Sequence, residues 1–157
     1  MKEGTFTILI LEDDPNDVFL LKRALQKNDI RNPVYVVNDG VEGVAYLSGQ
    51  RQYADRETFP FPRLIILDLK MPRMGGLEVL QWLQQHPEYQ VIPTLVLSSS
   101  KQQIDICRAY RLGVNSYMVK PATFDELQTM IKKVYEYWET CAKPEADVRS
   151  THSVEGP

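Results

Sequence analysis

The sequence has few cysteines, no long apolar run and no large excess of charge of either sign. Only two of its 157 residues are cysteine, Cys107 and Cys141, which is too few for a disulfide framework and favours a reducing compartment. No apolar stretch approaches the roughly 20 residues that cross a membrane, and the run at residues 6–11 is too short for a signal peptide. A net charge of -3 gives no electrostatic argument for nucleic-acid binding. We therefore expect a cytoplasmic protein that binds neither membrane nor nucleic acid.

The remaining composition is that of an ordinary globular chain. Hydrophobic residues make up 43% of the sequence and charged residues 25%, and 157 residues suit a single domain that folds without metal or disulfide. Two polar segments lack periodicity: the proline-ended connection over residues 48–62 and the stretch over residues 143–157. We expect one folded domain over residues 1–142, with a loosely packed connection inside it, and a disordered tail over residues 143–157.

Five short apolar runs predict a parallel β-sheet that is buried on both faces. They are rich in Val, Ile and Leu and do not alternate with polar residues, as is typical of strands covered on both sides. The runs are Phe6–Leu11, Val34–Val37, Leu64–Leu67, Thr94–Leu97 and Ser116–Val119. A helical pattern follows each run, and this alternation predicts an open parallel sheet with helices on both faces.

Capping residues mark where three of these helices begin. Asp14 precedes a proline, which suits the first position of a helix. Two further pairs have the spacing of a capping box: Ser100 with Gln103, and Thr123 with Glu126. We therefore expect helices directly after Asp14, Ser100 and Thr123.

Polar side chains follow four of the apolar runs, at the strand ends where open α/β sheets form their sites. They are Glu12, Asp13 and Asp14 after the first run, Asp68 and Lys70 after the third, Ser98–Ser100 after the fourth, and Lys120 after the fifth. Carboxylates packed together resist ionising, and a hard divalent cation such as Mg²⁺ resolves that repulsion. A lysine and a hydroxyl beside them suit a transferring phosphoryl group, for which an aspartate can be the nucleophile. The pattern predicts a metal-assisted phosphoryl site.

Each of these residues also has a simpler interpretation. The simpler interpretations are a helix cap for Asp14, solvated strand-end charges for Glu12 and Asp13, a turn for Ser98 with Ser99 as its competitor, a loop charge for Lys120, and edge packing for Tyr117. Helix capping alone explains Asp14. For the others, it is their convergence on one edge of the sheet that favours a site.

Four motifs in this order resemble the response-regulator receiver family, also called CheY-like. They are ILILEDDP at the first strand end, LIILDLKMPRMGGLEVL around Asp68, PTLVLSSS at the fourth strand and NSYMVKP at the fifth. The resemblance covers about residues 5–140. It implies a doubly wound α/β fold with five parallel strands in the order 2-1-3-4-5 and five helices.

The resemblance also implies a role for each site residue. The implied phosphoacceptor is Asp68, and the implied partner of the phosphoryl oxygens is Lys120. The implied ligands of Mg²⁺, for which Mn²⁺ can substitute, are Glu12, Asp13, Asp68 and the backbone carbonyl of Lys70. The implied switch residues are Ser98 and Tyr117. A cis Lys120–Pro121 bond is expected as a family trait. Gly75 stands where many members have aspartate, and we expect the turn to survive because glycine permits almost any backbone angle.

As a member of this family the protein would be a response regulator of a two-component relay, phosphorylated by a sensor histidine kinase. It resembles stand-alone receivers that serve phytochrome kinases, and a histidine phosphotransfer protein is a further candidate partner. No DNA-binding effector domain is expected, and the domain would assist only its own phosphorylation and dephosphorylation rather than act as an enzyme on other substrates. Met130, Tyr135 and Tyr137 lie outside the apolar stripe of the last helix, so a homodimer through that face is a hypothesis, with scattered surface aromatics as its alternative.

Three other functions fit the sequence less well. A phosphatase of the haloacid dehalogenase type carries D-x-D-x-T after its first strand, whereas here Asp68 follows the third apolar run and Lys70 occupies the third position. A flavodoxin-like cofactor binder or nucleotide switch is disfavoured because no G-x-x-x-x-G-K-[ST] loop follows the first run. A degenerate receiver that only binds partners is disfavoured because every required residue is present.

Overall fold

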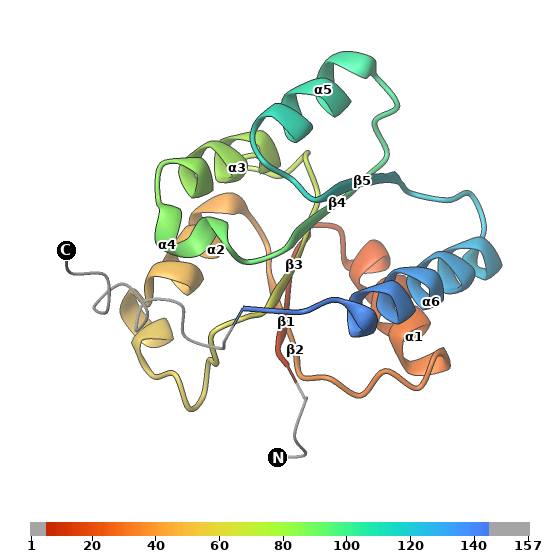
Figure 1. Ribbon diagram of the computed structural model, residues 1–157, viewed down its shortest axis with the longest axis horizontal. Helices are drawn as coiled ribbons and strands as arrows, with labels where there is room; N and C mark the ends of the chain where they lie inside the picture. Colours follow the sequence, from red (N-terminus) through yellow and green to blue (C-terminus); the bar gives the residue numbers. More distant parts are fainter. Residues whose placement is uncertain (1–5, 145–157) are drawn as a thin grey trace.

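The computed structural model describes residues 6–144 and places them around one five-stranded parallel sheet (Figure 1). The strands are β1 (Ile8–Leu11), β2 (Val34–Val37), β3 (Leu64–Leu67), β4 (Thr94–Ser98) and β5 (Ser116–Val119). Their order is β2-β1-β3-β4-β5, and every neighbouring pair is parallel. In register, Leu11 of β1 lies between Val37 of β2 and Leu67 of β3, so these strands end level with one another. The predicted fold class and strand order are confirmed.

Helices cover both faces of this sheet. They are α1 (Pro15–Lys27), α2 (Gly40–Ser48), α3 (Gly76–Gln84), α4 (Pro87–Gln90), α5 (Gln103–Arg111) and α6 (Phe124–Thr140), with a 3₁₀ helix η1 (Arg51–Ala54). Helices α1 and α6 lie on one face, and α2, α3 and α5 lie on the other (Figure 1). Five of the helices were expected. The two additions, α4 and η1, are four residues each, too short to show a helical period in the sequence.

The core consists of one hydrophobic cluster on each side of the sheet. Along β1, Leu9 and Leu11 pack into the cluster under α2 and α3, while Ile8 and Ile10 pack into the cluster under α1 and α6. All four are at most 1% exposed. Each such side chain stabilises the fold by roughly 1.5–3 kcal/mol through burial. This two-sided burial is the physical reason why the strand sequences do not alternate.

Two of the three predicted helix caps are confirmed. The Asp14 carboxylate accepts backbone N–H groups in the first turn of α1, and the Thr123 hydroxyl accepts one in α6. The cap at Ser100 is wrong, because α5 begins at Gln103 and its preceding residue makes no side-chain cap. The Ser100 hydroxyl instead donates to Asp105 Oδ2 at 2.5 Å, so that carboxylate competes for it.

The connection between α2 and β3 is packed rather than loose, which corrects our expectation. Tyr35, Tyr46, Tyr53 and Phe59 form an aromatic cluster with ring centroids 5.0–6.0 Å apart. Tyr46 is 1% exposed, and its hydroxyl donates to the Pro60 carbonyl at 2.7 Å. Composition alone made this segment look polar, and the spacing of its aromatic residues follows no helix or strand period.

Replacing Arg56 with methionine should destabilise the protein by about 2 kcal/mol, because its guanidinium closes the carboxyl end of α2. Arg56 Nη1 donates to Tyr46 O at 2.8 Å and Nη2 donates to Leu47 O at 2.9 Å, two carbonyls of the last turn of α2. Chemical denaturation measures the change. Arg31→Met, which breaks an exposed pair with Asp29, is the control and should cost less than about 0.5 kcal/mol. Equal losses for the two variants would contradict this role of Arg56.

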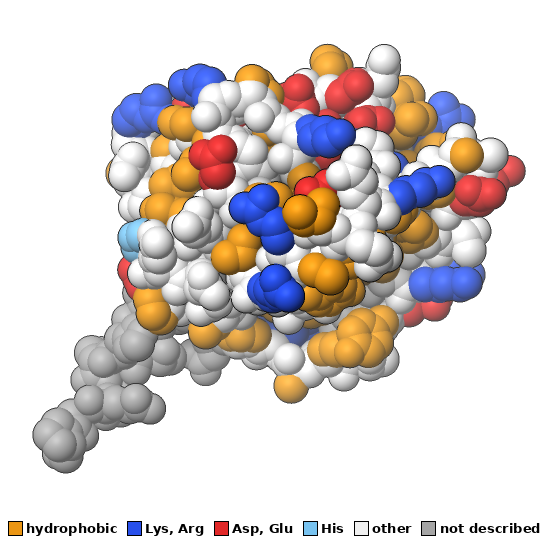
Figure 2. Space-filling view, turned by 90° about the horizontal axis from the view of Figure 1, so that it is seen from above, with side chains coloured by type: hydrophobic (Ala, Val, Ile, Leu, Met, Phe, Trp, Pro, Cys, Tyr) orange, Lys and Arg blue, Asp and Glu red, His pale blue; other side chains and the backbone are white. Residues whose placement is uncertain are grey.

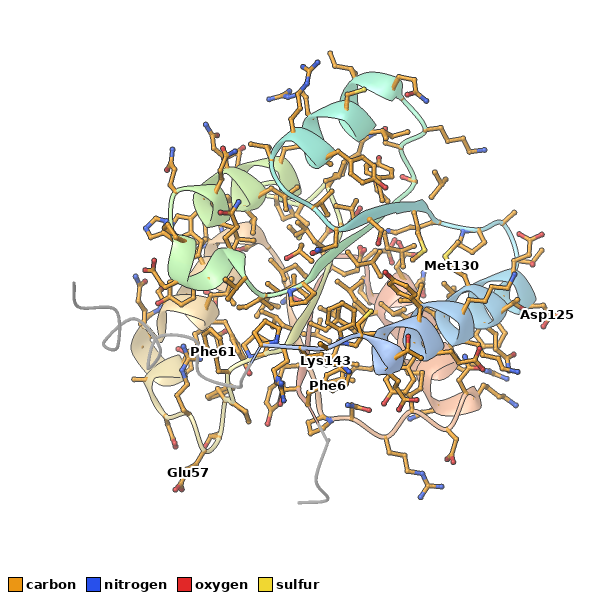
Figure 3. The ribbon with its side chains drawn as sticks, viewed as in Figure 1. Phe6, Glu57, Phe61, Asp125, Met130 and Lys143 are labelled. Carbon is orange, nitrogen blue, oxygen red and sulfur yellow. The ribbon has the colours of Figure 1, made fainter. Side chains whose placement is uncertain are left out.

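The last described residues return to the end of the sheet where β1 begins. The Lys143 ammonium lies 5.7 Å from the Phe6 ring and 5.9 Å from the Trp138 ring (Figure 3). The expected disordered tail, residues 143–157, lies outside the described residues except for Lys143 and Pro144. Within residues 6–144, no helix combines the length and the apolar character needed to cross a membrane.

Candidate functional site

Three carboxylates meet where β1 and β3 end. Ligand atoms of Glu12, Asp13 and Asp68 all lie within 4.8 Å of one another. Glu12 is 5% exposed and Asp68 is 7% exposed, whereas Asp13 faces solvent. Burial raises the pKa of the Glu12 carboxyl to about 7; the Asp14 N–H and Lys120 oppose the rise, and the charge of Asp68 adds to it. These oxygen donors fit a divalent cation, which would relieve the repulsion among them.

Lys120, directly after β5, supplies the positive charge within this cluster. Its Nζ lies 3.0 Å from Glu12 Oε2, 2.8 Å from Asp17 Oδ2 and 3.4 Å from Asp68 Oδ2. Burial alone would lower the pKa of Lys120, but its bonds to Asp17 and Glu12 and the charge of Asp68 outweigh burial and raise it. The ammonium is therefore charged at neutral pH and is held beside the Asp68 carboxylate.

Asp17 is the site residue that our sequence analysis missed. It lies in the first turn of α1, and 103 residues separate it from Lys120. An acidic residue in a first helical turn is common because it favours the helix dipole. That ordinary explanation left no signal for a second role.

Ser98 and Tyr117 meet at one backbone segment beside the carboxylates. Ser98 is fully buried while Ser99 is exposed, which favours Ser98 as the hydroxyl of the site. The Ser98 hydroxyl accepts the Ser100 N–H at 3.2 Å, and the Tyr117 hydroxyl donates to the Ser100 carbonyl at 2.8 Å. Ser100 thus links the two residues, a connection that the expected helix cap concealed.

The structure places Lys70 at the beginning of the loop that follows Asp68. It is exposed two residues after Asp68, and its backbone carbonyl stays a predicted ligand. The expected cis bond at Lys120–Pro121 is wrong, because residues 6–144 contain no cis peptide bond. A trans X–Pro bond is the more stable form by about 0.5–1 kcal/mol.

The family assignment follows from comparison with known proteins. The family model of the response regulator receiver domain matches residues 8–132. The chain belongs to this family. Response regulator Rcp1 of Synechocystis sp. is 34% identical over 140 residues, which cover 88% of this receiver and 93% of Rcp1.

Solved structures agree with this assignment. The crystal structure of the phosphorylated cyanobacterial phytochrome response regulator RcpA matches this receiver with a TM-score of 0.83 and 34% identity, over 90% of this chain and 100% of RcpA. The Mn²⁺-bound form of Rcp1 matches with a TM-score of 0.80 and 33% identity, over 89% and 99% of the two chains. A relative that binds a divalent metal accords with the three clustered carboxylates of this receiver.

A third buried acid of this receiver, Asp39, follows β2 and caps α2. Its Oδ1 accepts the Glu42 N–H at 2.9 Å, and its Oδ2 accepts Arg73 Nε at 2.8 Å. Burial acts to raise the pKa of Asp39, but the bonds from Glu42 and Arg73 outweigh it and hold the pKa below its usual value. Nothing local in the sequence indicates the bond to Arg73, which lies 34 residues further along the chain.

Asp39→Asn should cost this receiver about 2 kcal/mol at pH 7, and the cost should shrink as the solution is acidified. A carboxylate with a lowered folded-state pKa contributes stability that is present above its usual pKa of about 3.9 and is lost as the pH falls through the folded value. Denaturation of both proteins between pH 7 and pH 3 measures this difference. A difference that stays constant over this range would show that the Asp39 charge contributes nothing.

The basic side chains do not gather into one patch on the face seen in Figure 2. Lys and Arg are scattered there among acidic and apolar side chains (Figure 2). That face offers no continuous positive surface for a nucleic-acid backbone.

Proposed function

We propose that this receiver accepts a phosphoryl group on Asp68 from the phosphohistidine of a sensor histidine kinase. The observation that carries the proposal is the buried Asp68 carboxylate with Lys120 Nζ at 3.4 Å inside a cluster of acids. A carboxylate oxygen of Asp68 would form the new bond to phosphorus as the P–N bond of the donor breaks, and the leaving imidazole nitrogen would keep the electron pair.

The neighbouring residues would bind the phosphoryl oxygens and the metal. Lys120 would bind the phosphoryl oxygens, and the Ser98 hydroxyl would bind them once it leaves the Ser100 N–H. Glu12, Asp13, Asp68 and the carbonyl of Lys70 would hold Mg²⁺, for which Mn²⁺ would substitute. When bound, the ion neutralises charge that develops on the transferring group.

The partners in this proposal are proteins of the same relay. A phytochrome-type kinase is the favoured donor because the matched protein RcpA is named a phytochrome response regulator, and a histidine phosphotransfer protein is a candidate acceptor. The receiver would act in the cytoplasm and would catalyse only its own phosphorylation and dephosphorylation. Both cysteines are free thiols, in keeping with a reducing compartment.

A homodimer through the outer face of α6 is a further part of the proposal. Tyr137 is 70% exposed. Met130, labelled in Figure 3, and Tyr135 pack partly against the core, and the Tyr135 hydroxyl donates to Asn32 Oδ1. Light scattering of the wild type and of Tyr137→Ser tests the dimer, and a monomer in both, with and without phosphorylation, would contradict it.

Intact mass after incubation with acetyl phosphate and Mg²⁺ tests the proposed function. We expect the wild type to gain one phosphoryl group, and we expect no gain in EDTA or in Asp68→Asn. Asp125→Asn, which removes an exposed carboxylate from α6, is the matched control and should gain the group normally (Figure 3). A gain that survives in Asp68→Asn, or no gain from either acetyl phosphate or a phosphorylated kinase, would contradict the proposal.

A further inference from the structure

The loop between Asp68 and α3, residues 69–75, is fastened to the beginning of α2 at two points. Arg73 binds Asp39 Oδ2 through two nitrogens, with Nε at 2.8 Å and Nη2 at 2.7 Å. One residue further on, the Met74 carbonyl accepts the Gly40 N–H at 2.9 Å. Gly40 has no room for a side chain, because a Cβ there would lie 2.5 Å from Met74 O. Loop and helix are therefore in close contact along this line.

The anchor on the α2 side is rigid. Asp39 is 6% exposed, and its second oxygen is held by the Glu42 N–H. The Glu42 side chain is fixed in turn, because Oε2 accepts the Tyr53 hydroxyl at 2.7 Å and Oε1 accepts Arg51 Nη2 at 2.8 Å. A side chain that binds Asp39 is thus attached to the folded core.

Arg73 itself adopts a backbone conformation that non-glycine residues rarely hold. Its φ is +62°, in the left-handed region. Such a residue persists where its surroundings determine it, and strained residues of this kind collect at functional sites. The contact with Asp39 favours arginine here over glycine, which would adopt the same angle without strain.

We propose that Arg73 and Asp39 are positioning residues for the metal site: their contact fixes the loop that carries the Lys70 carbonyl. The inference rests on the proposed function, in which that carbonyl is a metal ligand. Arg73 follows Lys70 by three residues, and its guanidinium binds Asp39 rather than the acidic cluster. Mutation of residues that hold metal ligands in place commonly weakens metal binding by about 10-fold to 100-fold.

The sign of the effect separates positioning from plain electrostatics. Arg73→Gly removes a positive charge near the acidic cluster, so Coulomb attraction alone would make a divalent cation bind more tightly. Positioning predicts weaker binding, since the loop loses its anchor. Arg31→Gly is the matched control, because Arg31 is also an exposed arginine that pairs with an aspartate, Asp29, but it lies outside the loop and outside its anchor on α2.

The experiment is a Mn²⁺ titration of the metal-free protein, with free Mn²⁺ counted by electron paramagnetic resonance. We expect Arg73→Gly and Asp39→Asn each to bind Mn²⁺ about tenfold more weakly than the wild type. The double variant should be no weaker than the singles, because both remove one contact. Arg73→Lys should recover part of the loss, and Arg31→Gly should stay within about twofold of the wild type. Amide exchange at Gly40 should be faster in Arg73→Gly without any metal present.

Each other outcome points to a different failure. If the wild type binds no Mn²⁺, the proposed metal site fails, and this inference fails with it. If the wild type binds Mn²⁺ but a folded Arg73→Gly binds it equally or more tightly, positioning alone fails and the proposed function stands. Equal weakening in Arg31→Gly would also overturn the inference, because the effect would then be one of general stability.

Discussion

Replacing Lys120 with methionine is expected to slow phosphorylation of Asp68 by about 100-fold to 1,000-fold. Methionine keeps the unbranched stem but removes the ammonium that lies 3.4 Å from Asp68 Oδ2. In the proposed function, that ammonium would donate to the phosphoryl oxygens, on which negative charge develops during the transfer. The rate of mass gain with acetyl phosphate at saturating Mg²⁺ measures the effect.

The same substitution should also change how the fold depends on metal. Without Lys120, the buried carboxylates of Glu12 and Asp68 face each other with no cation, which should cost about 3 kcal/mol in metal-free protein at pH 7. Mg²⁺ should restore more stability to the variant than it adds to the wild type. Lys132→Met, at an exposed position on α6, is the control and should change neither rate nor stability. A Lys120→Met protein that is phosphorylated at the normal rate would rule out this role of the lysine.

The strands and most of the site could be predicted because their signals are local. A strand buried on both faces needs several consecutive apolar residues, and the polar residues that follow Leu11, Leu67 and Val119 mark the strand ends. Since parallel strands end at the same edge of the sheet, the strand order alone predicts that Glu12, Asp68 and Lys120 lie close together. Here chain topology turns local patterns into a site.

The contacts that could not be predicted join residues far apart in the sequence. Asp17 binds Lys120 across 103 residues, and Arg73 binds Asp39 across 34. Each of these acids has a sufficient local explanation, a helix end, and local explanations hide a second partner. The aromatic packing around Tyr46 was missed for the same reason, since its members come from β2, α2 and the connection that follows.

Gly76→Ala tests how closely the loop after Asp68 is packed, and it should destabilise the protein by about 3 kcal/mol. A Cβ at Gly76 would lie 2.3 Å from the Asp68 carbonyl oxygen and 2.7 Å from Leu69 Cα. Both are backbone atoms, so the strand end that carries Asp68 must shift. The midpoint temperature of thermal unfolding should fall by roughly 10 °C, and the fraction that stays folded should be phosphorylated more slowly.

Gly75→Ala is the control that separates this clash from the general loss of a glycine. Gly75 has an ordinary φ of −79°, and a Cβ there would come no closer than 3.1 Å, to the Leu69 carbonyl oxygen. Its loss should cost less than about 1 kcal/mol. If both variants lost the same stability, the close approach of α3 to Asp68 would not be what requires glycine at position 76. If Gly76→Ala alone lost both stability and phosphorylation, the packing of the helix start would be part of what holds Asp68 in place.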